Sequence, residues 1–273
     1  MEDLSPLTKQ LIASILNKLY NYDEIYITDI IPDNRQYEGK YNIIKHVLEE
    51  NGVIKIDGNK IKKGYIYNEN KNYFVLKRDI KINVSERGDR AYSSLTELIP
   101  LTPLDKISHI MHKHHSKTSS DVVRCNKVRI YDPLNLGKVT ADCKKQQQGN
   151  IVNIDVSFQP SLIPGQIVTW SYYTWDKEYY GTTIEEIMKK YNVDYSSEGI
   201  AIASPTYLAK ITVELPWKPS LAQAKESITS PVNIFLNPIT IPYNLKIENN
   251  MVTLELVNPR MGAYALVWKP PTK

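Results

Sequence analysis

The stretch Tyr41-Asn-Ile-Ile-Lys-His-Val-Leu-Glu-Glu-Asn-Gly52-Val-Ile54 decides the fold of the N-terminal part of the chain. Its apolar residues recur every three or four positions, which predicts a helix with one inward stripe. Asn51-Gly52 then supplies a residue suited to the left-handed conformation that ends many helices. The helix is therefore expected to end there and to lead into an extended segment.

The sequence on both sides continues this arrangement. Upstream, residues 7–19 carry the apolar stripe of a first helix, which begins after the N-cap and first-turn proline Ser5-Pro6. Residues 25–31 follow and end at a polar turn. Downstream, residues 53–57 and 61–67 are predicted strands joined through Gly58-Asn59.

This pattern resembles the winged helix-turn-helix DNA-binding domains of bacterial and archaeal regulators. The likeness rests on residues 27–31 as the short second helix and on residues 41–54 as the recognition helix that runs into the wing. It covers about a quarter of the chain, and the long polar turn at 32–36 and Gly39 depart from the pattern. The resemblance implies that the partner is double-stranded DNA.

Helical geometry selects the side chains that would reach DNA. Basic and amide side chains lie opposite the apolar stripe, where Arg and Asn can pair with guanine and adenine edges in the major groove. Lysines of the wing would meet phosphates. The predicted DNA-binding residues are Arg35, Asn42, Lys45, His46, Lys60, Lys62 and Lys63.

The distribution of charge favours this orientation but leaves alternatives open. Residues 1–34 hold two lysines and six acidic residues, whereas residues 35–78 hold ten basic and five acidic residues. Glu38 and Glu49, however, share the outward face with the basic side chains. Many winged helices contact only proteins or form dimers. A protein partner or a homodimer is therefore the first alternative, and a different fold of this segment is the second.

The rest of the chain shows the period of two that is typical of strands. Apolar and polar residues alternate over 152–158, 211–215, 252–256 and 264–268, and prolines separate the runs. This spacing predicts a β-sandwich or barrel, interrupted by one helix because Thr183-Ile-Glu-Glu186 matches a capping box. The predicted fold is α+β: a winged helix at 1–78, then an all-β, sandwich-like domain at 79–273.

Four of the five histidines fall between His109 and His115. If this region is a helix, Asp105, His109 and His112 share one face, and such a set could hold zinc or another transition metal. Neighbouring lysines oppose a cation, and no distant ligand completes the site. An exposed polar helix or loop is the simpler interpretation, and a pH-sensitive patch or a phosphate contact is another. No metal or other cofactor is assigned.

Aromatic residues gather between Trp170 and Tyr180. Aromatic side chains on a strand can stack a sugar or a nucleobase, which makes Trp170, Tyr172 and Trp175 candidate ligand-binding residues. Alternate members of such a group more often fill a sandwich core, with the others at its rim.

Composition permits several cellular contexts. A net charge of +4 allows nucleic-acid binding without requiring it. The two cysteines form no CxxC pair, so reduced thiols in an intracellular protein are expected. The first residues lack the features of a signal peptide, and no apolar run approaches the roughly 18 residues that span a bilayer. A cytoplasmic location without a membrane partner is expected.

The sequence contains no Gly-rich phosphate loop, GxSxG elbow or kinase motif set. The predicted function is a DNA-binding regulator or accessory factor whose β domain binds a ligand or partner. One alternative is a non-catalytic protein-interaction module of a larger assembly. The other is a metal-dependent enzyme that uses the region His109–His115.

Overall fold

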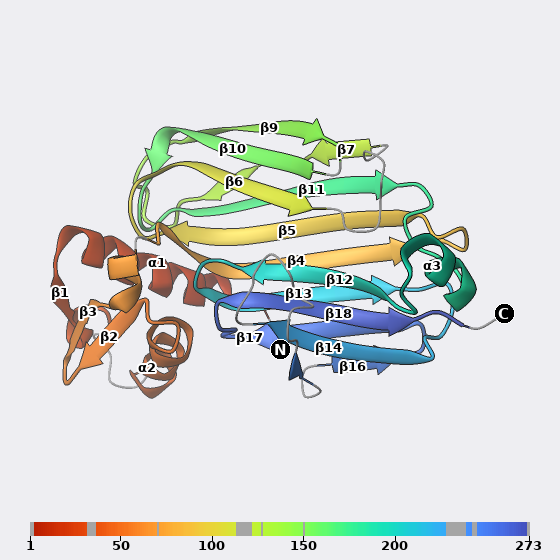
Figure 1. Cartoon of the computed structure of the whole chain (residues 1–273). Helices are drawn as coiled ribbons and strands as arrows, with labels where there is room; N and C mark the ends of the chain where they lie inside the picture. Colours follow the sequence, from red (N-terminus) through yellow and green to blue (C-terminus); the bar gives the residue numbers. More distant parts are fainter. Residues whose placement is uncertain are drawn as a thin grey trace.

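The computed structural model describes residues 3–31, 37–69, 71–112, 122–126, 128–149, 151–227, 239–241 and 245–271. For Tyr37, Met111 and His112 it describes the backbone alone. Strands dominate the described residues (Figure 1). Among these residues, no helix has the length and apolar character needed to cross a membrane.

An N-terminal module, residues 3–69, combines two helices with a small sheet (Figure 1). The sheet has the order β1-β3-β2. In chain order the elements are α1 (Pro6–Asn21), β1 (Glu24–Tyr26), a 3-10 turn (Ile27–Asp29), α2 (Tyr37–Ile44) with a π-helical continuation (Lys45–Glu49), β2 (Ile54–Asp57), β3 (Lys60–Lys63) and a second 3-10 turn (Tyr65–Glu69).

Local sequence signals fix the ends of these helices. The Ser5 side chain accepts a hydrogen bond from the Thr8 amide at 3.1 Å, and Pro6 follows it, which confirms the predicted start of α1. Gly52 adopts the expected left-handed conformation, with a φ of +68°. A Cβ atom at this position would lie 2.0 Å from the Tyr65 ring, so a larger residue would have to displace that ring.

A mixed eight-stranded sheet forms the centre of the molecule (Figure 1). Its order is β16-β17-β13-β4-β5-β11-β7, and β8 also pairs with β11. Strands β4 and β13 run parallel to each other. The strands are β4 (Tyr73–Val84), β5 (Arg90–Pro100), β7 (Val122–Cys125), β8 (Arg129–Tyr131), β11 (Ile167–Asp176), β13 (Thr206–Glu214), β16 (Leu245–Glu248) and β17 (Met251–Val257).

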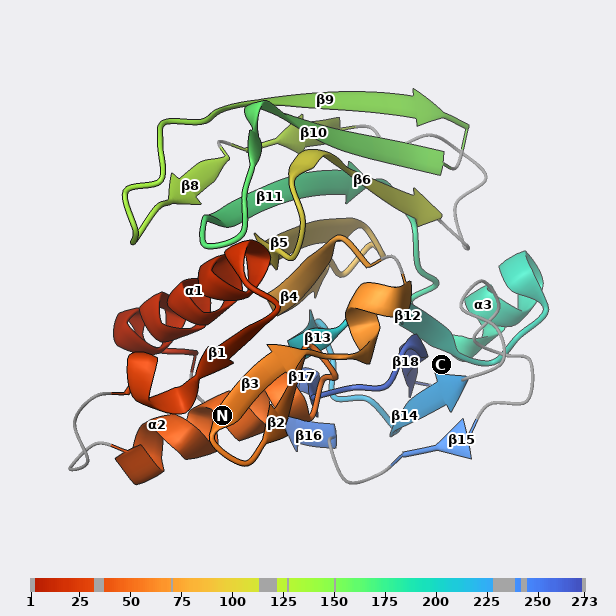
Figure 2. The same ribbon diagram turned by 90° about the vertical axis from the view of Figure 1, so that its left-hand side faces the viewer.

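Two smaller antiparallel sheets pack on one side of this large sheet (Figure 2). Their orders are β6-β10-β9 and β12-β18-β14-β15. Helix α3 lies at one end of the strands and follows the N-cap Thr183, whose side chain accepts a hydrogen bond from the Glu186 amide, as the capping box predicts. The elements are β6 (Leu104–His112), β9 (Thr140–Gln148), β10 (Ile151–Leu162), α3 (Ile184–Tyr191), β12 (Ser196–Ile202), β14 (Leu221–Ser227), β15 (Ile239–Thr240) and β18 (Gly262–Lys269).

Alternation along the strands gives the large sheet two faces. The inner face, which includes Ile80, Trp170 and Ile211, shares a buried core with the two smaller sheets. The opposite side, which we call the outer face, carries the intervening residues, such as Lys81 and Thr212. The prediction of a β-rich fold is confirmed, because the alternating runs at 152–158, 211–215, 252–256 and 264–268 lie in or directly beside β10, β13, β17 and β18.

A second buried cluster joins the N-terminal module to one end of the large sheet. Ile12 and Leu16 of α1 pack in this cluster with Phe74 and Leu76 of β4 and with Ile99 of β5. Residue 78, where the sequence predicted the end of the first domain, therefore lies inside β4, a strand whose first half packs against α1. The two-domain division and the winged-helix assignment stay predictions.

Candidate functional site

The predicted DNA-reading residues lie on α2, on its π-helical continuation and on the hairpin of β2 and β3, apart from Arg35, which falls outside the described residues. Asn42 and Lys45 are exposed. His46, by contrast, is tied to the large sheet, because its ring packs edge-on against that of Tyr207 on β13, with centroids 5.9 Å apart. This end of the helical segment therefore faces the rest of the chain.

A hydrogen-bond network strengthens that attachment. Nδ1 of His46 lies 2.8 Å from Oε2 of Glu50. Asn258, in the turn after β17, donates from its Nδ2 to the His46 carbonyl and to Oε2 of Glu50, each at 2.9 Å. Its own side-chain oxygen accepts from Nδ2 of Asn51 at 2.7 Å. The helix end that the DNA hypothesis requires to be free is thus held by another part of the protein.

The three hairpin lysines that were predicted to contact DNA each form an ion pair within the module. Their partners are carboxylates of the same module, so these three charges are each paired at its surface. The pairs are Lys60 with Glu24 at 2.5 Å, Lys62 with Asp57 at 2.8 Å and Lys63 with Asp23 at 3.2 Å.

The histidine-rich region is not the expected helix. Residues 104–112 form strand β6, in which Asp105 and His109 lie about 13 Å apart along the backbone. The His112 side chain and residues 113–121 lie outside the described residues. Within the part of the chain that the structure describes, no group of three or more His, Cys, Asp or Glu side chains is arranged to hold a metal ion. The helix that would have placed Asp105, His109 and His112 on one face was therefore wrong.

His109 instead packs against the inner face of the large sheet. Its ring centroid lies 5.3 Å from that of Tyr172 and 6.0 Å from that of Trp170. Nη2 of Arg78 approaches Nε2 of His109 to 3.2 Å. Burial first, and the Arg78 guanidinium second, hold the pKa of His109 well below its ordinary value, so the imidazole is neutral near pH 7.

Two of the three candidate aromatic residues belong to the core. Trp170 and Tyr172 are 3% and 0% exposed, and their rings stack with centroids 5.8 Å apart. A ligand would reach them only after the sheets separate. For these two residues the core interpretation is the correct one. Trp175 differs, because it lies on the outer face and is half-buried.

A buried ionic cluster around Arg90 was missed from the sequence. Nε of Arg90 donates to Oδ2 of Asp176 at 2.9 Å, and Nη1 donates to Oε1 of Glu198 at 2.6 Å. The guanidinium also lies 3.8 Å from the Tyr179 ring centroid. Burial disfavours the charged guanidinium, but these carboxylates outweigh it and raise the pKa of Arg90. All of these groups are engaged with one another, which indicates a structural role.

The outer face brings together residues that are distant in the sequence. Lys81 on β4 pairs in register with Ser93 on β5, which pairs with Tyr173 on β11, which in turn pairs with Arg124 on β7. Directly paired side chains lie about 5 Å apart. We define the outer patch as Lys81, Leu95, Arg124, Tyr173 and Trp175.

The charges of the outer patch differ from those nearby. At the end of the outer face near α1, Lys9 pairs with Glu97 at 2.8 Å and Lys77 pairs with Asp3 at 2.7 Å. Lys81 and Arg124 are exposed, and no residue in the described ranges forms an ion pair with either of them. The patch therefore presents two uncompensated cations beside aromatic and aliphatic surface. Of the residues in the outer patch, only Trp175 was singled out from the sequence. The reason is that aromatic residues occupy both odd and even positions of one strand, and these positions face opposite sides of a sheet.

A shallow depression of about 160 Å³ lies elsewhere on the outer face, over β13, β16 and β17. Lys210 and Glu255 face each other in register across two of these strands. The depression thus combines both signs of charge and selects no ligand class. Its lining residues are Lys210, Lys246, Glu248, Met251, Thr253 and Glu255.

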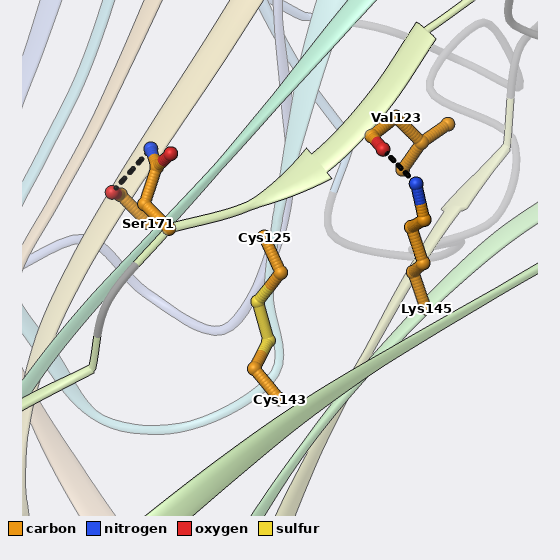
Figure 3. The surroundings of a disulfide bond; sticks show 6 residues. Val123, Cys125, Cys143, Lys145 and Ser171 are labelled. Carbon is orange, nitrogen blue, oxygen red and sulfur yellow. Dashed lines mark hydrogen bonds between the residues drawn. A yellow bond between two sulfur atoms is a disulfide. The ribbon is translucent and has the colours of Figure 1, made fainter.

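A disulfide joins an edge of the large sheet to one of the smaller sheets (Figure 3). It joins Cys125, the neighbour of Arg124 on β7, to Cys143 on β9, with Cα atoms 6.3 Å apart. The Lys145 ammonium on β9 donates a hydrogen bond to the Val123 carbonyl on β7. The expectation of two reduced thiols was wrong, because β7 and β9 are edge strands of facing sheets and bring the cysteines together.

The sequence matches no known family model and no curated protein. Some solved structures share part of its outline. A protein of Parabacteroides distasonis proposed to be a protease shows a TM-score of 0.42 and 11% identity, over 73% of this chain and 41% of that one. The M1 zinc metallopeptidase of Deinococcus radiodurans gives 0.35 and 11%, over 73% and 42%.

Leukotriene A4 hydrolase of Saccharomyces cerevisiae gives a TM-score of 0.35 and 10% identity, over 72% of this chain and 29% of that one. The chain thus spans less than half the length of each of these proteins. Likeness at this level assigns no activity to this chain.

The prediction of a DNA-binding regulator was wrong. Within the chain, the His46 end of the predicted reading helix is bound to the large sheet, and the wing lysines are paired with carboxylates. Of the residues predicted to contact DNA, His46, Lys60, Lys62 and Lys63 are thus engaged within the chain, whereas Asn42 and Lys45 are exposed.

Proposed function

We propose that this chain is a non-catalytic protein-interaction module whose partner binds the outer face of the eight-stranded sheet. The observation that carries the proposal is the outer patch, where Tyr173, Trp175 and Arg124 adjoin on the side of the sheet opposite the two smaller sheets. Trp, Tyr and Arg are the residues that most often dominate the binding energy of protein interfaces.

The ionisable groups with strongly shifted pKa values support a structural rather than a chemical role for the interior. His109, Arg90 and Tyr180 lie in the core, and each of them contacts other buried side chains rather than an open cleft. Burial, followed by the Glu198 carboxylate, raises the pKa of Tyr180. Groups held in this way stabilise the packing of the sheets and are not placed to meet a substrate.

In this proposal the β region is a sandwich-like domain, and the N-terminal module is a winged helix that serves as a structural wall. This module covers one end of the large sheet through the second buried cluster, which includes Ile12 and Leu16 of α1, and through the Lys9–Glu97 pair. The outer patch lies further along the strands and remains available to the partner. A role in protein contact agrees with the known use of winged helices outside DNA binding.

Site-specific photo-crosslinking tests the proposal. A benzoyl-phenylalanine at position 173 reports on the outer patch, and the same residue at position 22 is the matched control, because Tyr22 is 64% exposed on the N-terminal module. In cells that make the protein, we expect a discrete protein adduct at 173 that is absent at 22. The captured protein, once purified, should bind the unmodified chain saturably. Equal adducts at both positions, or none at 173, would contradict the proposal.

A further inference from the structure

The two exposed cations of the outer patch stand on either side of its aromatic centre. Lys81 and Arg124 are separated by three strand spacings, about 14 Å, with Ser93 and Tyr173 between them in the same row. Trp175 and Leu95 flank that row on their own strands, and Leu95 is 37% exposed. The outer patch therefore presents aromatic and aliphatic surface between two cations.

This arrangement complements a particular kind of partner segment. A guanidinium binds a carboxylate through two parallel hydrogen bonds, and an ammonium binds one as a point charge. The aromatic surface between them suits an aliphatic or aromatic side chain. In an extended segment, residues four apart lie about 13 Å apart and on the same face, which matches the separation of the two cations.

We infer that the outer patch binds an extended protein segment in which two acidic residues, four positions apart, flank an apolar residue. The first carboxylate meets Arg124, the second meets Lys81, and the apolar side chain between them packs on Tyr173 and Trp175. This inference rests on the proposed function and names the chemistry of its partner. The partner is recognised by charge complementarity together with burial of a single apolar anchor.

The remaining charges of the outer face favour a protein over a nucleic acid. Asp79, Glu97 and Glu214 lie on the same face as the patch. Nucleic-acid affinity comes from many simultaneous phosphate contacts, whereas the outer patch itself holds two cations, Lys81 and Arg124. Carboxylates on the binding face would repel the other phosphates of a strand.

Fluorescence anisotropy with defined peptides tests the inference. The probe is a labelled peptide with Glu-Ser-Leu-Ser-Glu at its centre, and the comparison peptides carry Lys-Ser-Leu-Ser-Lys or Glu-Ser-Ser-Ser-Glu. We expect saturable binding of the first peptide alone, weakened at least tenfold by Arg124→Glu and by Trp175→Ala. Lys144→Glu, on exposed β9, is the matched charge control and should leave the affinity unchanged.

The decisive part of the experiment reverses the charges of the protein and of the peptide together. The double variant Lys81→Glu with Arg124→Glu should lose the acidic peptide and gain the lysine peptide, a result that misfolding does not produce. Equal affinity for peptides of either charge, or no binding at peptide concentrations up to about 1 mM, would overturn the inference. Tighter binding of a single-stranded oligonucleotide than of the acidic peptide would also overturn it.

The two proposals fail in different ways. If position 173 captures a partner whose binding is unchanged by the double charge reversal, the acidic-segment inference is wrong and the interaction module stands. If position 173 captures no partner, the interaction module itself is wrong.

Discussion

At the scale of single residues, the buried charges depend on partners that the chain itself supplies. Arg90 and Asp176 have side chains that are 2% and 1% exposed, and their closest approach is 2.8 Å. A charge in such a position is stable only while its partners remain, because removal of a partner leaves the buried charge incompletely compensated. The sequence did not show this pair, since its members lie on different strands.

Asp176→Ala is therefore expected to lower the free energy of unfolding by about 3–5 kcal/mol, because it removes the most deeply buried partner of Arg90 and leaves Glu198 as the one remaining carboxylate of the pairings described for this guanidinium. Urea denaturation measures the change. Asp142→Ala removes a carboxylate that is 70% exposed on β9 and should cost less than about 0.5 kcal/mol. Similar losses in the two variants would mean that the Arg90 cluster is not a buried ionic unit.

His109 predicts a defined pH dependence of stability. Its pKa in the folded protein lies well below 6.5, because of burial and of Arg78, whereas the unfolded chain takes up a proton near pH 6.5. The unfolded state therefore binds more protons as the pH falls below about 6.5, and stability declines. Above that pH the contribution is fully present.

Denaturation midpoints between about pH 7 and 5 check this expectation against the unperturbed His pKa. His109→Gln should show a shallower decline than the natural chain, since glutamine does not titrate. His46→Gln is the control, because His46 is exposed at the module interface, and it should keep the slope that His109 causes. An unchanged slope in His109→Gln would contradict the assignment.

At the scale of elements, the sequence predicted strands well where one face is buried throughout. Val152, Ile154, Val156 and Phe158 alternate as expected along β10. Strand β6 was mistaken for a helix, because Leu104 and Ile107 are both buried despite their odd spacing. The register of the opposite strand shifts between Ser157 and Leu162, and such an irregularity breaks the period of two that sequence reasoning relies on.

Strand β7 is the element most dependent on a covalent tie. It is four residues long, pairs with β11 alone among the described strands, and is joined to β9 by the Cys125–Cys143 disulfide. A crosslink between residues 18 apart restricts the unfolded chain and contributes about 3 kcal/mol by the loop-entropy argument. It also holds the strand that presents Arg124.

A dithiol reductant is therefore expected to lower stability by about 3 kcal/mol and to accelerate amide hydrogen exchange in β7 more than in β5. Cys143→Ser should reproduce both effects without reductant. The reductant should then have no further effect on this variant, which controls for nonspecific action. Equal exchange in β7 before and after reduction would show that the disulfide does not hold this strand.

At the scale of the whole molecule, the N-terminal module and the large sheet share one apolar cluster. Leu16 of α1 is fully buried with Phe74 and Ile99 of the sheet. The local sequence predicted the helices and hairpin of the module, but not this docking, because it depends on strand ends that come later in the chain. The DNA hypothesis failed for the same reason, since pairing across strands decides which charges remain free.

The shared cluster predicts a single cooperative unfolding transition. All four tryptophans lie at position 170 or later and report on the β region, whereas helix circular dichroism reports largely on α1 and α2. The two signals should coincide, and Leu16→Ala should shift both by about 2–5 kcal/mol. The exposed Leu7→Ala should shift neither. Separate transitions would indicate two independent domains.

The central claim, that a protein partner occupies the outer face, is tested most directly by the crosslinking yield of position 173 against position 22. We expect a discrete adduct at 173 that disappears when Trp175 is also replaced by alanine, and no such adduct at 22. Adducts that form equally at both positions, or that survive Trp175→Ala unchanged, would contradict it.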